Sequence, residues 1–430
     1  VRLAADLYLP AGGDATGPHP VLLEYLPYRK AESRARNAAL YAPFVRAGYV
    51  VARVDIRGTG QSEGTLVPQE YSDTELDDGE RVVDWLSRQP WSSGAVGMFG
   101  ISWGGFNAIQ MTLRHPPALK AILAVDATED LYAEDVHTID GILHVDSWEM
   151  SQDLDNARPG APAYRVDEAY FRERFDQPPW MLQTKRQQRM GPYWSRASAT
   201  GRWGEITTPM YLIGGWYDGY RSSIPRFLQH ATAAPVKALV GPWTHAWPHE
   251  GGPGPAIEWR ASAVRWFDHW LRSVDTGILA EPRLAVFVRE AHGPGPRLDT
   301  VAGHWRWEAG WPQPSTAPGA RVREVTWPLQ ADHRLRLAPS RPATHQLHYQ
   351  PSAGVEAGGP VLWWGDVAAD QRPTDAQSLL YDTAPLAAPL EILGSKPDYQ
   401  KNVDIGGAIL ACAVLVYFVG AGVARLRRRY

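Results

Sequence analysis

Ser102, with a glycine two residues away on each side, is the residue of this sequence best placed to do chemistry. The segment GISWGG at 100–105 follows a short apolar run and precedes a stretch that reads as an amphipathic helix. A serine at such a strand-to-helix corner is the nucleophile-elbow pattern, in which flanking glycines allow close backbone approach. The helix N-terminus then offers amides to a developing oxyanion. The alternative is a glycine-rich loop in which Ser102 only caps the helix.

A nucleophilic serine needs a base to take its proton and an acid to orient that base. In this type of fold the partners follow the serine in the order acid, then histidine, each just past a strand end. Asp218 lies in GGWYDG after the apolar run 210–213, and His245 lies in GPWTH after the run 237–240. Ser102, Asp218 and His245 are therefore the predicted catalytic triad.

Two other residues compete for these roles. Asp126 ends the run that follows the elbow, one strand earlier than the expected order, so we interpret it as a cap or as an anchor for the segment after it. His249 lies four residues beyond His245 in a Pro/Gly-rich loop with no strand before it.

The elements that must position these residues alternate between strands and helices. Apolar runs predict strands at 1–10, 20–26, 48–56, 96–99, 119–125, 209–214 and 236–240, and helical spacing occurs at 77–87, 106–114, 222–230 and 257–271. Continuous β-branched runs are typical of strands buried on both faces. The pattern predicts an α/β fold with a parallel sheet covered by helices on both sides.

Changes of texture along the chain predict its domain organisation. Residues 1–128 and 205–305 form the two parts of the α/β core, and residues 129–204, which have little strand signal, form an inserted helical cap. Residues 311–394 have short β-rich runs at 322–325 and 346–349 between Pro and Gly clusters, which indicates a jelly-roll-like β-sandwich that is incomplete.

An uncharged apolar segment at 405–424 precedes a cluster of arginines. About 20 residues at ~1.5 Å each match a ~30 Å hydrocarbon core. We expect a transmembrane helix with a cytoplasmic C-terminus and an extracytoplasmic catalytic part. The alternative is a buried helix or strand pair in a soluble, cytoplasmic protein.

Composition excludes several classes of function. With 43 basic against 47 acidic side chains and no basic stripe, no nucleic-acid partner is expected. Cys412 is the single cysteine, and no metal or cofactor motif occurs, so no metal or cofactor is predicted. The sequence leaves the oligomeric state open.

Several motifs in a fixed order now give the sequence a family resemblance. They are LPYRK at 26–30, DIRGTGQSEG at 55–64, the GISWGG elbow, GGWYDGY at 214–220, GPWTH at 241–245 and DQRP at 370–373. With them the chain resembles the cocaine-esterase-like and X-prolyl-dipeptidyl-peptidase-like hydrolases, a branch of the α/β-hydrolase superfamily. The β region is shorter than the family's jelly roll, and a membrane anchor is not part of the family pattern.

The resemblance implies roles for individual residues. Ser102 would be the nucleophile, His245 the general base and acid, and Asp218 the residue that holds the imidazole. The oxyanion donors would be the backbone N–H of Trp103 and the phenol of Tyr28. A neutral phenol is suited to this task because its ordinary pKa of about 10 keeps it protonated at neutral pH.

The expected function is a serine hydrolase that cleaves small-molecule acyl esters, and amides as a further option, with Tyr220, Trp216 and Trp148 lining its pocket. Residues 190–208 carry a single carboxylate, Glu205, which favours neutral or acidic acyl groups. The cap's other carboxylates, Glu168, Glu173 and Asp176, keep an X-prolyl dipeptidyl aminopeptidase or an α-amino acid ester hydrolase as alternatives. A catalytically silent, membrane-tethered binding module is the alternative from another class.

Overall fold

The computed structural model describes residues 1–10, 17–139, 142–143, 155, 157–293, 295, 298–312, 327–339, 341, 343–348, 372, 376, 379–387, 391 and 393. The predicted transmembrane segment at 405–424, the strand expected at 322–325 and most of the predicted β-sandwich lie outside these residues. Within them, no helix has the length and apolar character needed to span a membrane. Residues 346–348 are described and contain no strand.

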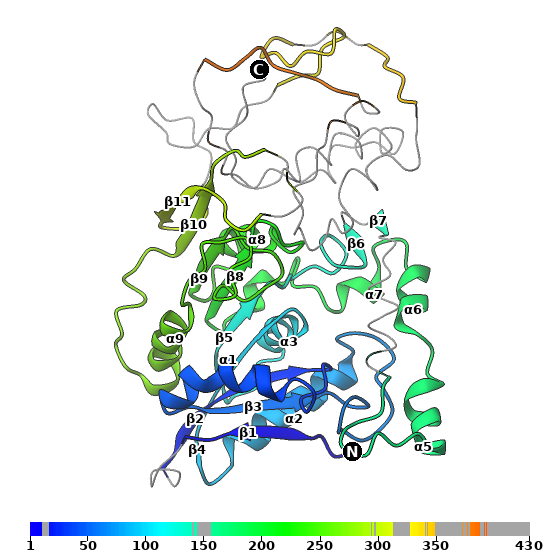
Figure 1. Ribbon diagram of the computed structural model, residues 1–430, viewed down its shortest axis with the longest axis vertical. Coiled ribbons are helices and arrows are strands. Elements are labelled where there is room, and N and C mark those ends of the chain that lie inside the picture. The colour runs from blue at the N-terminus through cyan, green and yellow to red at the C-terminus, as the bar shows by residue number, and fades with distance from the viewer. Residues whose placement is uncertain are drawn as a thin grey trace.

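One mixed sheet organises the described chain, and its nine strands run in the order β1-β3-β2-β4-β5-β8-β9-β10-β11 (Figure 1). The strands are β1 Ala5–Tyr8, β2 His19–Leu26, β3 Val50–Asp55, β4 Ser92–Ile101, β5 Leu119–Val125, β8 Met210–Gly215, β9 Val236–Gly241, β10 Leu284–Arg289 and β11 Gly303–Glu308. The edge strands β1 and β11 pair antiparallel with their neighbours, and the strands between them pair parallel. The predicted parallel sheet is thus confirmed for its centre.

Helices cover both faces of the sheet because its central strands are apolar on both sides. Helices α1 Arg34–Arg46 and α9 Arg260–Arg272 pack on one face, where Phe44 and Trp266 are fully buried. Helices α2 Asp73–Ser87, α3 Trp103–Thr112 and α8 Ser223–His230 pack on the other face, around Phe106 and Phe227. Helix α1 and strands β10 and β11 were not predicted from the sequence.

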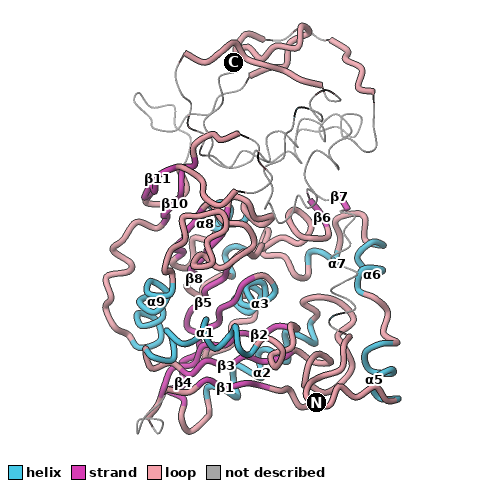
Figure 2. The backbone as a smooth tube through the Cα atoms, viewed as in Figure 1, coloured by secondary structure: helices cyan, strands magenta, loops and turns pink. Residues whose placement is uncertain are grey.

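The chain between β5 and β8 consists mostly of loops with short helices (Figure 2). Its elements are β6 Thr138–Ile139, β7 Ile142–Leu143, α5 Glu168–Tyr170, η1 Phe171–Phe175, α6 Trp180–Arg186, α7 Pro192–Ser195 and η2 Trp203–Glu205. Polar contacts tie this segment to the core. The indole of Trp180 donates to the carbonyl of Val67 at 2.6 Å, and Arg174 donates to the carbonyls of Gly60 and Ser62.

Candidate active site

Ser102 stands at a strained turn between β4 and α3. Its φ of 56° and ψ of −126° lie where side chains are rarely found, and its backbone N–H donates to the carbonyl of Val125 at 3.0 Å. The turn needs glycines, since a Cβ on Gly100 would lie 2.6 Å from the carbonyl carbon of Gly104. Strain of this kind persists only where the surrounding structure holds it, which favours a functional role for Ser102.

Glu75 of α2 supports the residue that follows the serine. The indole of Trp103 donates to its carboxylate at 2.8 Å, as do the Asn107 amide and the Tyr71 backbone, both at 2.9 Å. Burial raises the pKa of Glu75 to about 7, against these three hydrogen bonds, which act to lower it. Sequence reasoning missed this residue, because Glu75 precedes the helix predicted at 77–87 and no local pattern signals its burial.

Tyr28 lies in the loop after β2, with its phenol oxygen 3.4 Å from the hydroxyl oxygen of Ser102. Burial raises the pKa of Tyr28 to about 12, although hydrogen bonds from Ser102 and the Trp103 backbone act to lower it. The phenol is therefore a neutral donor at any ordinary pH. Its contact with the Trp103 backbone means that the two predicted oxyanion donors meet beside the serine.

The Tyr28 loop is held by a buried carboxylate. Asp55, at the end of β3, accepts from the Lys30 backbone at 2.7 Å and from the Gln61 backbone at 3.0 Å. The close packing requires a glycine at Gly60, whose φ is +50° and whose added Cβ would lie 2.1 Å from the Asp55 carboxylate. The turn at Gly60 thus helps to hold the Tyr28 loop through Asp55.

Asp218 and His245 follow the neighbouring parallel strands β8 and β9 and lie in direct contact. The Nδ1 atom of His245 is 2.6 Å from Oδ2 of Asp218, whose side chain is fully buried. The second carboxylate oxygen of Asp218 accepts from the Tyr220 backbone at 2.7 Å. An acid at Nδ1 fixes the tautomer of an imidazole and leaves Nε2 for proton transfer.

The serine and this acid–histidine pair lie at one edge of the sheet. Strands β4, β5, β8 and β9 are adjacent and parallel, so the loops after their carboxyl ends meet. The ring of Tyr220 spans part of the distance between them. It lies 5.0 Å from the ring of Phe106, one turn into the helix that Ser102 begins, and 5.7 Å from the His245 ring.

The predicted pocket residues have different surroundings. Tyr220 is buried beside His245, as described above, and its hydroxyl donates to Oδ1 of Asp135 at 3.3 Å. Trp216 is also buried, and its indole donates to the carbonyl of Phe287 at 2.8 Å, a contact that joins β8 to β10. Trp148 lies outside the described residues.

The two competing candidates also have clear positions. Asp126, which we interpret from the sequence as a cap or as an anchor for the segment after it, accepts from the backbone of Ala246 at 3.2 Å, next to the predicted base. Sequence spacing could not reveal this contact, because the two residues are brought together only by the sheet. His249 accepts from the indole of Trp259 at 3.0 Å and has a structural role.

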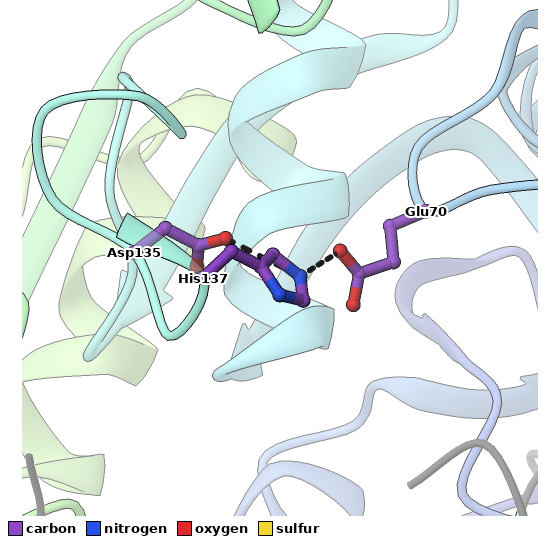
Figure 3. A group of neighbouring side chains, drawn as sticks. All are labelled: Glu70, Asp135 and His137. Atoms are coloured by element: carbon purple, nitrogen blue, oxygen red, sulfur yellow. Dashed lines mark hydrogen bonds and ion pairs between the residues drawn. The ribbon is translucent and has the colours of Figure 1, made fainter. Parts of the chain in front are cut away.

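A cluster of Glu70, Asp135 and His137 lies near Asp218 and His245 and was not predicted from the sequence. His137 contacts the carboxylate of Glu70, and its Nε2 is 3.6 Å from Oδ2 of Asp135 (Figure 3). The donor atoms of the three residues lie within 4.8 Å of one another, a spacing that a cation could bridge, as do those of Asp126, Asp218 and His245. Asp135 and His137 are buried, and the Tyr220 hydroxyl connects them to the predicted triad.

Two arginines of the segment 190–208 are paired with protein groups. Arg196 donates to the backbone carbonyl of Glu70 at 2.6 Å, and Arg202 pairs with Glu205 at 2.7 Å. The expectation of neutral or acidic acyl groups rests on the single carboxylate in residues 190–208. Glu70 and Asp135 approach the site from other segments, so that count was incomplete.

The mixed sheet and its helical layers form an α/β fold that comparisons with solved structures match. An α-amino acid ester hydrolase superposes with a TM-score of 0.66 at 20% identity, covering 91% of this chain and 72% of that one. A CocE/NonD family hydrolase from Staphylococcus aureus gives a TM-score of 0.58 at 20% identity, covering 78% of this chain and 57% of the other.

Sequence comparison identifies the family. Residues 1–247 match the family model of the X-Pro dipeptidyl-peptidase (S15 family), and the chain belongs to this family. It is also 30% identical over 445 aligned positions to the cocaine esterase of Rhodococcus sp. (strain MB1 Bresler), covering 92% of this chain and 74% of that protein. The resemblance inferred from the motifs is thus confirmed, and the chain is a hydrolase.

Proposed function

We propose that this protein cleaves small carboxylic acyl esters through a covalent acyl-enzyme, with Ser102, His245 and Asp218 as its triad. The observation that carries the proposal is the 2.6 Å contact between His245 and Asp218, after strands adjacent to the one that ends at the strained Ser102. An esterase name among the relatives supports ester chemistry.

In the proposed mechanism, the Ser102 hydroxyl oxygen attacks the ester carbonyl carbon while His245 takes its proton. The tetrahedral oxyanion is stabilised by the Tyr28 phenol and the Trp103 backbone N–H. His245 then gives the proton to the departing alkoxide, which leaves an acyl-Ser102 ester and an alcohol. Water, deprotonated by His245, attacks the acyl carbonyl, and His245 then returns the proton to the departing Ser102 oxygen, which releases the carboxylic acid and restores the Ser102 hydroxyl. Asp218 holds the imidazole throughout.

A fluorophosphonate probe tests this assignment, because it phosphonylates an activated serine. Wild type should be labelled, and Ser102→Ala should lose both labelling and ester hydrolysis. Ser93→Ala, an exposed serine at the other end of β4, is the matched control and should behave like wild type. Labelling that persists in S102A would remove Ser102 from the mechanism. A wild type without labelling or hydrolysis would favour the silent binding module.

A second candidate function, hydrolysis of α-amino acyl esters or amino-terminal peptides, is favoured by one observation. Asp135 receives the Tyr220 hydroxyl, and Tyr220 packs against His245, so carboxylates stand close to where an acyl group would lie. Glu70 and Asp135 could bind the ammonium group of such a substrate.

Matched esters distinguish the two candidates. The p-nitrophenyl esters of phenylacetate and of phenylglycine differ by one ammonium group. An acyl esterase should prefer the neutral ester or treat both alike. An amino ester hydrolase should prefer the charged ester by about tenfold or more, and Asp135→Asn should abolish that preference.

A further inference from the structure

Asp126 is a buried carboxyl group beside the proposed triad that the mechanism above does not use. It follows the last residue of β5, the strand between β4 and β8, so its position lies between the serine and Asp218 along the sheet edge. Its φ of 45° is positive, and its backbone N–H donates to the carbonyl of Ile213 at 2.9 Å. The side chain is 3% exposed.

The carboxyl group of Asp126 joins the two loops that carry the proposed acid and base. It accepts from the backbone N–H of Ala246, the residue after His245, at 3.2 Å. It also accepts from the backbone N–H of Gly215, the last residue of β8, three positions before Asp218. One side chain therefore holds both loops, which also contact each other through Tyr217 and Trp243.

The charges around Asp126 favour its neutral form. One of its carboxyl oxygens lies within 4.8 Å of a carboxylate oxygen of Asp218 and of a ring nitrogen of His245. Two ionised carboxylates this close in a buried site repel each other, so one of them keeps a proton. Asp218 has the imidazole and the Tyr220 N–H as partners, whereas burial and the charge of Asp218 raise the pKa of Asp126 well above its ordinary value.

We propose that Asp126 is a positioning residue that, as a neutral carboxyl group, holds the Asp218 and His245 loops in register and leaves the negative charge on Asp218. The inference rests on the triad proposed above. We therefore expect the rates of labelling and of ester hydrolysis to depend on the hydrogen bonds of the Asp126 carboxyl group and not on a negative charge at this position.

Two substitutions separate hydrogen bonding from charge. Asp126→Asn retains a neutral acceptor of the same shape and should keep the fluorophosphonate labelling rate and kcat within about threefold of wild type. Asp126→Ala leaves the Gly215 and Ala246 N–H groups without this acceptor. It should lower both rates by about 10- to 100-fold, with KM changed less than about threefold, because loop geometry is lost and substrate contacts are not. Asp84→Asn, an exposed site in α2, is the control.

The pH profile of D126N tests whether Asp126 is charged or neutral in the working enzyme. If Asp126 is neutral, the acid limb of kcat/KM in D126N should coincide with that of wild type. A shift of that limb would mean that a charge next to His245 was removed, and would overturn the proposal. This arm decides the matter even if D126A does not fold.

D126A labelling at the wild-type rate would refute the positioning role. An equal loss in D126N and D126A would refute the neutral form. A wild type that is not labelled at all would instead refute the triad on which the inference rests.

Discussion

At the scale of single residues, the site combines a strained serine with a phenol held close to it. Ser102 keeps a positive φ, which costs of order 1–3 kcal/mol in backbone strain, and Tyr28 reaches its hydroxyl from another loop. Tyr28 also meets the backbone N–H of Trp103, the other oxyanion donor that we propose. As a hydrogen-bond donor to the oxyanion, the phenol would stabilise the transition state more than the bound ester.

Replacing Tyr28 by Phe should therefore lower kcat by about 100-fold while KM changes little, the effect of removing one oxyanion donor. Steady-state kinetics on a p-nitrophenyl ester measure this. Tyr211→Phe is a matched control, because burial also raises the pKa of Tyr211 to about 12 and its hydroxyl contacts Ser262. A loss in Y211F as large as in Y28F would contradict the assignment.

The same tyrosine makes a prediction about alkaline pH. Because burial raises the pKa of Tyr28 to about 12, the phenol keeps its proton up to about pH 11. Wild type and Y28F should thus have rate–pH curves of the same shape between pH 8 and 10, displaced by a constant factor. An alkaline fall near pH 10 that disappears in Y28F would show that the phenol ionises earlier.

At the scale of elements, the elbow depends on how α2 and α3 pack beneath it. Glu75 of α2 binds the Trp103 indole and the Asn107 amide, both on α3, and the Tyr71 backbone. Burial raises its pKa to about 7 from an ordinary 4.5. The folded protein therefore holds the proton of Glu75 more tightly than the unfolded chain does. The free energy of unfolding falls as the pH rises from 4.5 to about 7.

The free energy of unfolding should lose about 3 kcal/mol from this group between about pH 4.5 and 7 and then level off. Glu75→Gln removes the titration, so the pH 5 to pH 8 stability difference should shrink by most of that amount relative to wild type. Urea denaturation of both proteins at the two pH values measures it. Equal differences in the two proteins would contradict the role of Glu75.

At the scale of the whole molecule, a buried ion cluster fastens the chain leaving β5 to helix α8. Arg226 of α8 pairs with Glu134 at 2.8 Å and also with Glu129, both of which are buried. Ser223 donates to the Glu129 carboxylate at 2.5 Å. Glu134 of this cluster directly precedes Asp135, which accepts from the Tyr220 hydroxyl. The cluster therefore positions the chain after β5 next to Tyr220.

Removal of the arginine should be costly, since it leaves two buried carboxylates without their cation. Arg226→Met is expected to lower the free energy of unfolding by about 3–5 kcal/mol, measured by denaturation at pH 7. Arg226→Lys keeps the charge and should lose clearly less. If R226K is as unstable as R226M, the shape of the side chain and not its charge holds this junction.

The sequence by itself determined the order of the core strands along the chain, the elbow at Ser102 and the pairing of Asp218 with His245. Local signals suffice for these, because apolar periodicity specifies buried strands and each of these site residues lies within four residues of the end of one. Strands β10 and β11 and helix α1 were missed, since their patterns are mixed and tertiary packing selects their conformation.

Only the tertiary structure decided which distant residues meet at the site. Asp126 next to Ala246, Glu75 under Trp103, and Asp135 against Tyr220 are separated by 120, 28 and 85 positions in the chain. No periodicity encodes such contacts, because a carboxylate in a loop or on a helix has the same local pattern whether it faces water or is buried. Sheet order and helix packing bring these groups together, and burial then changes their proton affinities.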